Sequence, residues 1–190
     1  GWNRAGVAIT GATSSTYSLV QADVGSVITV TASYTDGQGT AESVSSSATS
    51  AVANVNDAPT GSVTISGTAT QGETLTAANT LADLDGLGAI GYQWLRDGAA
   101  ITDATSSTYT LVDGNYTGSG PPVSDVDNQM KVRVTYTDAY GHFESITSLA
   151  TSSVANVNDA PIGVPTISGE TTQGQTLTAV TSGISDLDGL

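Results

Sequence analysis

"MKVRVTYTD", residues 130–138, alternates apolar and polar side chains at every second position. Successive side chains of a β-strand point to opposite faces of a sheet, so this period predicts a strand with one buried and one solvated face. The expected buried face consists of Met130, Val132, Val134 and Tyr136, and the solvated face of Lys131, Arg133, Thr135 and Thr137. Short segments of similar character lie before and after it, separated by turn residues, and none carries the apolar stripe of a helix. The sequence therefore predicts an all-β fold, an antiparallel β-sandwich.

Several of these segments occur twice in the chain. Two pairs are nearly identical: "AITGATSSTYSLV" (8–20) and "AITDATSSTYTLV" (100–112), and "TISGTATQGETLTA" (64–77) and "TISGETTQGQTLTA" (166–179). A third pair, "ADVGSVITVTASYTD" (22–36) and "SDVDNQMKVRVTYTD" (124–138), matches less closely. The repeating unit has about ninety residues, a size at which one sandwich buries a core of its own.

This repetition divides the chain into one complete and two partial repeats. Residues 58–159 form the complete repeat, residues 1–57 the C-terminal part of a preceding repeat, and residues 160–190 the N-terminal part of the next. An insertion, "DGNYTGSGPP" (113–122), has no counterpart in residues 1–57 and is expected to form an exposed loop with room to contact a partner. The two partial repeats are complementary pieces of one unit, and pairing of such pieces between chains would be open-ended.

The order of landmarks within the repeat resembles that of an immunoglobulin-like domain. Gly72 precedes the second strand, Trp94 lies in the third, and an aspartate-containing turn at residues 22–25 precedes an alternating strand. The resemblance implies tandem immunoglobulin-like β-sandwich repeats in which Trp94 packs between the sheets, with Trp2 as its counterpart in the first partial repeat. The chain has no cysteine, so apolar side chains are expected at the usual disulfide positions: Leu75 or Ala77, and Val30 or Val132.

The charge balance narrows the classes of partner. Four basic residues stand against 18 acidic ones, which gives a net charge of -14 and a pI near 4.1. Nucleic-acid binding is not expected, because phosphate contacts require clustered Lys and Arg. No apolar run approaches the ~18 residues of a membrane-spanning helix. Most of the acidic residues are Asp, which favours turns and the ligation of hard cations.

Two short motifs are each duplicated, and both supply oxygen ligands. "NVNDAP" stands at residues 54–59 and 156–161, and "DLDG" at residues 83–86 and 186–189. In an immunoglobulin-like arrangement the linker and this loop meet at the same end of a sandwich, so the motifs predict Ca2+ at one or more junctions. The first junction would collect Asn56, Asp57, Asp83, Asp85, Asp138 and, from the preceding repeat, Asp23. The second would collect Asn158, Asp159, Asp186 and Asp188, approached by Asp97, Asp125 and Asp127. The alternative interpretation is a set of solvated polar turns, which use the same residues.

With these motifs in place, the chain resembles a known group of proteins. "NVNDAP" is similar to the linker of cadherin-like repeats, and the wider pattern is similar to the tandem immunoglobulin-like repeats of large secreted bacterial adhesins, including RTX-type and biofilm adhesins. The resemblance implies an extracellular or cell-surface stalk whose joints are stiffened by calcium. Its partners would be the adjacent repeats and a cell-surface or matrix ligand. Two features differ from these families: the glycine-rich nonapeptide of RTX proteins is absent, and the junctions carry fewer acidic residues than those of cadherins.

Two other classes of function have weaker support in the sequence. His142, the single histidine, lies in the turn "TDAYGHFE" (137–144) without an identifiable nucleophile, so it is expected to be a turn residue and the protein is not expected to be an enzyme. The remaining alternative is a binding module for a glycan, ice or a protein partner that uses exposed loops. Its candidate aromatic residues are Tyr109, Tyr116 and Tyr140, of which Tyr109 is equally well placed for the core.

Overall fold

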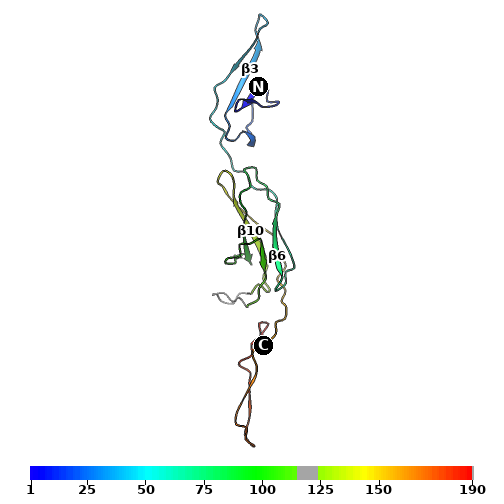
Figure 1. Cartoon of the computed structure of the whole chain (residues 1–190). Helices are drawn as coiled ribbons and strands as arrows, with labels where there is room; N and C mark the ends of the chain where they lie inside the picture. Colours follow the sequence, from blue (N-terminus) through cyan, green and yellow to red (C-terminus); the bar gives the residue numbers. More distant parts are fainter. Residues whose placement is uncertain (115–123, 190) are drawn as a thin grey trace. The chain divides into compact units, whose positions relative to one another are not determined.

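The computed structural model describes residues 1–114 and 124–189 (Figure 1). These residues form antiparallel β-sheets with one short 3-10 helix, so the predicted all-β class is confirmed. The insertion predicted at residues 113–122 lies largely outside the described residues, and Tyr116 lies there with it. Among the described residues, no helix has the length and apolar character needed to cross a membrane.

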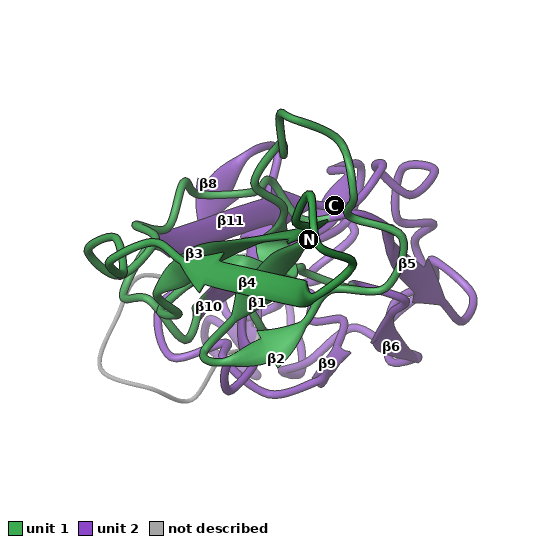
Figure 2. Cartoon of the chain, turned by 90° about the horizontal axis from the view of Figure 1, so that it is seen from above, with its two compact units in different colours: residues 1–59, 82–87, 137–142 green, residues 60–81, 88–136, 143–190 purple. Residues whose placement is uncertain are grey.

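The chain forms two compact units, which Figure 2 colours separately. The first unit consists of Gly1–Pro59, Ala82–Leu87 and Thr137–His142, and the second of Thr60–Leu81, Gly88–Tyr136 and Phe143–Leu190. Two loops from the middle of the sequence therefore belong with the N-terminal part of the chain. One of them, Ala82–Leu87, contains the first "DLDG" motif.

The first unit contains one four-stranded antiparallel sheet. Its strands are β1 (Trp2–Arg4), β2 (Val7–Ala8), β3 (Ile28–Thr35) and β4 (Ala41–Ser45), in the order β2-β1-β3-β4, and the 3-10 helix η1 (Gln21–Asp23) precedes β3. Trp2 stands opposite Val30 where β1 pairs with β3. The indole N–H of Trp2 donates a hydrogen bond to the Ser14 carbonyl over 2.9 Å, and the ring stacks on Tyr17 with centroids 5.9 Å apart.

The second unit contains two larger sheets that enclose one core. The first is formed by β7 (Gly91–Arg96), β8 (Ala99–Ala100), β10 (Met130–Thr137) and β11 (Phe143–Thr147), in the order β11-β10-β7-β8. The second is formed by β5 (Val63–Ser66), β6 (Thr74–Asn79) and β9 (Thr108–Thr110), in the order β5-β6-β9. Trp94 stands opposite Val132, which is the register that Trp2 has with Val30 in the first unit. The sequence repeat is thus also a repeat of strand register.

A separate strand pair near the end of the chain also belongs to the second unit. It consists of β12 (Thr166–Ser168) and β13 (Thr178–Val180), with Ile167 opposite Ala179. In the complete repeat Ile65 stands opposite Ala77 in the same way. The duplicated sequence at residues 64–77 and 166–179 therefore forms the same antiparallel pair twice.

The core lies between the two larger sheets of the second unit. Met130, Val132 and Val134 are completely buried on one face of β10, whereas Arg133 on the other face is exposed, so the predicted alternation is confirmed. The opposite sheet contributes Val63, Leu75 and Ala77 to the same hydrophobic cluster. Burial of each large apolar side chain contributes about 1.5–3 kcal/mol to folding, and this packing is the main stabilising term in a chain without disulfides.

Trp94 is the largest completely buried side chain of this core, as its position in the repeat predicts. Its indole N–H donates a hydrogen bond to the Ser106 carbonyl over 2.9 Å, and its ring lies 5.7 Å from that of Tyr109. Leu75 and Val132, two of the residues expected at disulfide positions, are also completely buried. Both positions are thus filled by ordinary apolar packing.

Replacement of Trp94 tests this assignment. Trp94→Ala removes the whole buried ring and leaves the Ser106 carbonyl without its donor, so we expect the free energy of unfolding of the second unit to fall by about 3–5 kcal/mol. Urea unfolding followed through amide signals of β5 to β11 measures the change. Trp2→Ala is the matched control, because Trp2 is only partly buried and lies in the first unit. Equal losses from the two variants in these signals would contradict the assignment.

Candidate functional site

The first "NVNDAP" linker is tied to the first "DLDG" loop through one carboxylate. The backbone N–H of Asp57 donates to Asp85 Oδ2 over 2.6 Å, and Gln21 Nε2 donates to Asp85 Oδ1 over 2.7 Å. Asp85 is only 2% exposed, so these are partly desolvated, charge-assisted hydrogen bonds. All three residues belong to the first unit.

The "DLDG" loop is shaped by its first aspartate and its glycine. Asp83 Oδ1 accepts a hydrogen bond from the backbone N–H of Asp85 over 2.8 Å, and the Asp83 carbonyl accepts one from Gly86 over 3.2 Å. Gly86 has a φ of 97°, a conformation that L side chains rarely adopt. The two aspartates therefore have different roles: Asp83 closes the turn, and Asp85 presents its carboxylate to the linker.

The second linker and the second "DLDG" loop repeat this contact within the second unit. The backbone N–H of Asp159 donates to Asp188 Oδ2 over 2.7 Å, and the N–H of Asp188 donates to Asp186 Oδ1 over 2.9 Å. Asn156 Nδ2 donates to Asp188 Oδ1 over 2.6 Å. Four of the predicted site residues are thus brought into two equivalent pairs: Asp57 with Asp85, and Asp159 with Asp188.

The two contacts differ in the third side chain that reaches the loop. At the first contact it is Gln21, which directly follows the repeated segment 8–20; the residue that directly follows the matching segment 100–112 is Asp113. The carboxylates of Asp113, Asp159 and Asp188 offer oxygen atoms that lie within 4.8 Å of one another. An amide donor at the first contact is therefore replaced by a third carboxylate at the second.

Gln21 also accounts for an unpaired atom. Asn54 Nδ2 is buried without a hydrogen-bond partner, whereas Asn156, which has the same place in the second linker, donates to Asp188. At the first contact Gln21 Nε2 donates to the equivalent oxygen of Asp85. The Gln21 amide therefore takes the acceptor that the Asn54 amide would otherwise use.

The geometry of the three carboxylates suits a hard cation. Ca2+ binds oxygen at about 2.3–2.6 Å, so oxygen atoms that share one ion lie within about 5 Å of one another. Gln71 Nε2 donates to Asp159 Oδ2 over 2.8 Å, and Gln71 Oε1 accepts from the N–H of Val157 over 3.0 Å, which orients the Asp159 side chain. A carboxylate has further lone pairs beyond these hydrogen bonds, so the cluster has acceptors left for an ion.

Other predicted ligands serve turns. Asp138 Oδ1 accepts hydrogen bonds from the N–H groups of Tyr140 and His142 over 2.8 and 2.9 Å. The next residue, Ala139, donates its N–H to the Asp85 carbonyl over 3.2 Å, so this turn lies beside the first loop. Burial raises the pKa of the Asp138 carboxyl, but the N–H groups of His142 and Tyr140 lower it more, and the net pKa is below the ordinary value. His142 lies in this turn, as predicted.

Four further predicted ligands are Asp97, Asp127, Asn158 and Asn56. Asp97 Oδ1 accepts a hydrogen bond from the N–H of Gln129 over 2.8 Å, and Asp127 is an exposed turn residue with a φ of 65°. Asn158 donates its Nδ2 to the Asp159 carbonyl over 3.1 Å, and Asn56 is an exposed linker residue. The participation of these four residues in a cation site stays a prediction.

Asp23 is completely buried among donors of its own repeat. Its Oδ1 accepts from Arg4 Nε over 2.7 Å, and its Oδ2 accepts from the Val20 N–H over 2.8 Å and from the Tyr17 hydroxyl over 3.1 Å. Burial raises the pKa of this carboxyl, but the Val20, Arg4 and Tyr17 donors lower it more, so the net pKa lies below the ordinary value. These donors occupy both oxygens, and the predicted role of Asp23 as a cation ligand gains no support from them.

Asp125 has the same environment in the complete repeat. Its Oδ1 accepts from Arg96 Nε over 2.7 Å, and its Oδ2 accepts from the Val112 N–H over 2.8 Å and the Tyr109 hydroxyl over 3.0 Å. Burial, followed by the charge and hydrogen bond of Asp125, raises the pKa of Tyr109 to about 12. Tyr109 is thus a structural residue that contacts Trp94 and Asp125.

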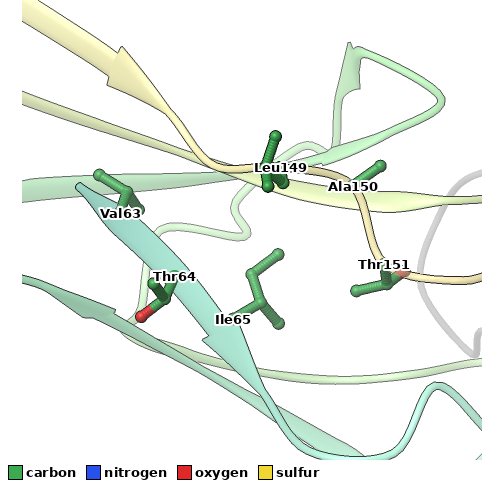
Figure 3. Close-up of a pocket in the computed structure, with 6 residues that line it drawn as sticks. All are labelled: Val63, Thr64, Ile65, Leu149, Ala150 and Thr151. Atoms are coloured by element: carbon green, nitrogen blue, oxygen red, sulfur yellow. The ribbon is translucent and has the colours of Figure 1, made fainter.

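A shallow apolar pocket lies at one edge of the second unit (Figure 3). Its volume is about 210 Å³, and it is lined by Val63, Thr64, Ile65, Leu149, Ala150 and Thr151. None of these side chains ionises at neutral pH, so this lining contains no side chain suited to general acid or base catalysis.

Comparisons with known protein families, with curated protein sequences and with solved structures find no match for this chain. The two linker–loop contacts and the three-carboxylate cluster therefore carry the functional argument.

The pKa of Tyr109 predicts an alkaline loss of stability. In the unfolded chain a tyrosine ionises near pH 10, while the folded Tyr109 keeps its proton up to about pH 12. The unfolded state then binds fewer protons than the folded state, so the free energy of unfolding falls as pH rises from about 10 to 12. Urea unfolding of the second unit over this pH range measures the fall in the free energy of unfolding. The fall is expected in the original chain and not in Tyr109→Phe. Tyr140→Phe, which removes an exposed phenol, leaves it in place; an unchanged pH profile in Tyr109→Phe contradicts the assignment.

Proposed function

We propose that this chain is a non-enzymatic structural spacer, built of tandem immunoglobulin-like repeats, from a bacterial cell-surface or secreted adhesin. The observation that carries the proposal is the hydrogen bond from the linker aspartate N–H to the second aspartate of the "DLDG" loop, which is made twice, over 2.6 Å and 2.7 Å. A spacer requires that each unit folds and that each joint is held, because the joints set the direction of the array. The same hydrogen bond at both linkers meets this requirement.

The cadherin-like character of the linker supports the same assignment. Pro59 and Pro161 close the two linkers and restrict the backbone at the entry to the next repeat. The strongly acidic composition suits an exposed, soluble stalk that repels its neighbours. On this proposal the chain is extracellular or attached to the cell surface, and adjacent repeats are its immediate partners.

Calcium is the proposed ligand of the second joint. Asp113, Asp159 and Asp188 supply three carboxylates to one small volume, and a divalent cation would offset their mutual repulsion. At the first joint the Gln21 amide donates a hydrogen bond to Asp85, where the second joint has a third carboxylate. We therefore propose that the ion binds the second joint more tightly than the first. This assignment adds Asp113 to the predicted ligands and gives no role to Asp23 or Asp125.

Calcium titration tests the ligand. The calcium-free protein is titrated with CaCl2 by calorimetry, and the melting temperature is recorded with and without a chelator. We expect saturable binding and a higher melting temperature with calcium, since an ion that binds only the folded state stabilises it. Asp113→Asn is expected to weaken binding at least about tenfold, whereas Asp103→Asn, which removes one exposed carboxylate elsewhere, leaves it unchanged. Equal calcium affinity in the original chain, Asp113→Asn and Asp103→Asn would show that Asp113 is not a ligand. A lack of calcium binding to the original chain would contradict the assignment of calcium.

Amide exchange tests the held joint independently of any metal. Asp85→Ala deletes the acceptor of the Asp57 N–H, and hydrogen bonds to charged groups are worth about 1.5–3 kcal/mol. The amide of Asp57 is therefore expected to exchange about ten times faster or more in this variant. Leu84→Ala, at an exposed position of the same loop, is the control and should leave the rate unchanged. Slow exchange of Asp57 in Asp85→Ala would show that other contacts hold the linker, and the spacer proposal would lose its main support.

A further inference from the structure

Strand β5 is the edge strand of a sheet in the complete repeat. The sheet has the order β5-β6-β9, so among the described residues β5 has a hydrogen-bonded neighbour on one side only. An edge strand offers unpaired N–H and C=O groups to a further strand, and natural proteins protect such edges with charged residues, proline or bulges. Residues 60–66 contain no charged residue and no proline, and β5 pairs with β6 residue by residue without a bulge. This edge is therefore unprotected.

The backbone groups of Val63 and Ile65 are directed away from β6. The Thr80 N–H donates to the Ser62 carbonyl over 2.9 Å, which makes Ser62 and Thr80 a hydrogen-bonded pair. Hydrogen-bonded and non-hydrogen-bonded pairs alternate along an antiparallel ladder, so Val63 and Ile65 belong to non-hydrogen-bonded pairs. In agreement, the N–H of Ala77, which stands opposite Ile65, donates over 2.8 Å to the segment that leads into β9. The N–H and C=O groups of Val63 and Ile65 therefore face the open edge.

The shallow pocket of Figure 3 lies beside this edge. Strand β5 lines one side of the pocket, and Leu149 and Ala150 lie on the other. Leu149 is 89% exposed, although its side chain is large and apolar. In the first repeat the matching residue is Ser47, as the segments "SITSLATSSV" (145–154) and "SVSSSATSAV" (43–52) show. The repeat therefore does not require leucine at this position for its fold, and Leu149 offers an apolar contact to a partner.

The two segments that line the pocket carry no charge, in a chain with a net charge of -14. Neither residues 60–66 nor residues 145–153 include an ionisable side chain. A strongly basic or acidic partner strand therefore finds no opposite charge here. Two copies of the chain repel each other through their acidic surfaces, and this repulsion is smallest where both surfaces are neutral. The edge thus suits a neutral strand, and β5 of a second copy is such a strand.

We propose that two copies of this chain associate through β5, with each β5 antiparallel to the other across a two-fold axis. Val63 then stands opposite Ile65 of the second copy, so that their outward N–H and C=O groups pair, and Thr64 stands opposite its own counterpart. The two pockets face each other, and the two Leu149 side chains fill the space between them. The interface is isologous, so association stops at the dimer. It is distinct from the linker joints and does not depend on calcium.

The first experiment measures mass against concentration and salt. The original chain, 18.9 kDa, is run by size exclusion with light scattering at rising concentrations in the presence of a chelator. We expect the weight-average mass to approach twice the monomer value and to rise no further. Added salt screens the repulsion between the acidic copies, so it is expected to tighten the dimer. A monomer at every concentration, growth beyond the dimer, or a dimer that salt weakens would each contradict the proposal.

Substitution of Leu149 tests the apolar contact. Leu149→Ser introduces the residue that the first repeat has at this position, and it is expected to raise the dissociation constant of the dimer at least about tenfold, because the buried apolar area is lost. Leu84→Ser is the matched control, since Leu84 is 71% exposed and lies in the first unit. It should leave the dissociation constant unchanged. Dimers of equal affinity in Leu149→Ser and the original chain would overturn the proposal.

Substitution of Thr64 tests the strand pairing. Thr64→Lys places two like charges directly opposite each other across the two-fold axis, and it is expected to prevent dimer formation. Thr76→Lys is the matched control, because Thr76 is also exposed but lies on β6, one strand away from the edge. It should dimerise like the original chain. A dimer of Thr64→Lys that is as stable as that of Thr76→Lys is incompatible with pairing through β5.

Amide hydrogen exchange locates the interface at single residues. The N–H groups of Val63 and Ile65 have no acceptor on β6, so they are expected to exchange at least about ten times more slowly at dimer-forming concentrations than in the monomer. The N–H of Thr64 faces β6 and should be protected at both concentrations. Protection that appears elsewhere, with none at Val63 and Ile65, would show that a different surface joins the copies. Amide signals of β6 and β10 that persist in the variants show that they remain folded.

Discussion

Packing of one strand face against a second sheet is the constraint on which the rest of this structure depends. The face formed by Met130, Val132 and Val134 has to be covered, and in the complete repeat β5 and β6 cover it. This fixes which side of each strand is apolar, the register of the strands and the position of Trp94. The loops at the ends of these strands are placed as a consequence, including the "DLDG" loops that hold the linkers. No disulfide contributes, so the packed face must supply the stability that such a crosslink would add.

A buried carboxylate adds a second, polar constraint to each repeat. Asp23 and Asp125 each accept hydrogen bonds from an arginine, a tyrosine and a backbone N–H near the start of the alternating strand. The chain has four basic residues, and two of them, Arg4 and Arg96, are used in this way. A buried ion pair costs desolvation and is retained where it fixes geometry, because a carboxylate with several donors admits few alternative packings. Arg4 and Arg96 therefore form their ion pairs inside the repeats and do not balance the negative charge of the joints.

The fold was predictable from the sequence because its signal is local and duplicated. The alternation in "MKVRVTYTD" indicates which residues of β10 are buried, and the repeat indicates that β3 has the same register with β1. The pairs Asp57 with Asp85 and Asp159 with Asp188 also follow from the duplicated motifs. Asp113 was missed because the insertion that begins there obscures its equivalence to Gln21. The burial of Asp23 and Asp125 was missed because their arginine and tyrosine partners are distant in sequence, and only the closed sheet brings them together. Sequence spacing alone does not distinguish a carboxylate that meets an arginine from one that meets a cation.

The duplication of the covering strands has a consequence for how this chain reaches its folded state. While the chain folds, the apolar face of β10 meets two nearly identical candidates, residues 64–77 and residues 166–179, and both can form an antiparallel pair of the same register. Two differences favour the correct candidate. Val63 and Ala69 pack against the core of the complete repeat, whereas the second copy carries Pro165 and Thr171 at these positions. A proline cannot donate to a strand pair and a threonine is poorer cover than an alanine, so these two positions favour residues 64–77 over the competing segment.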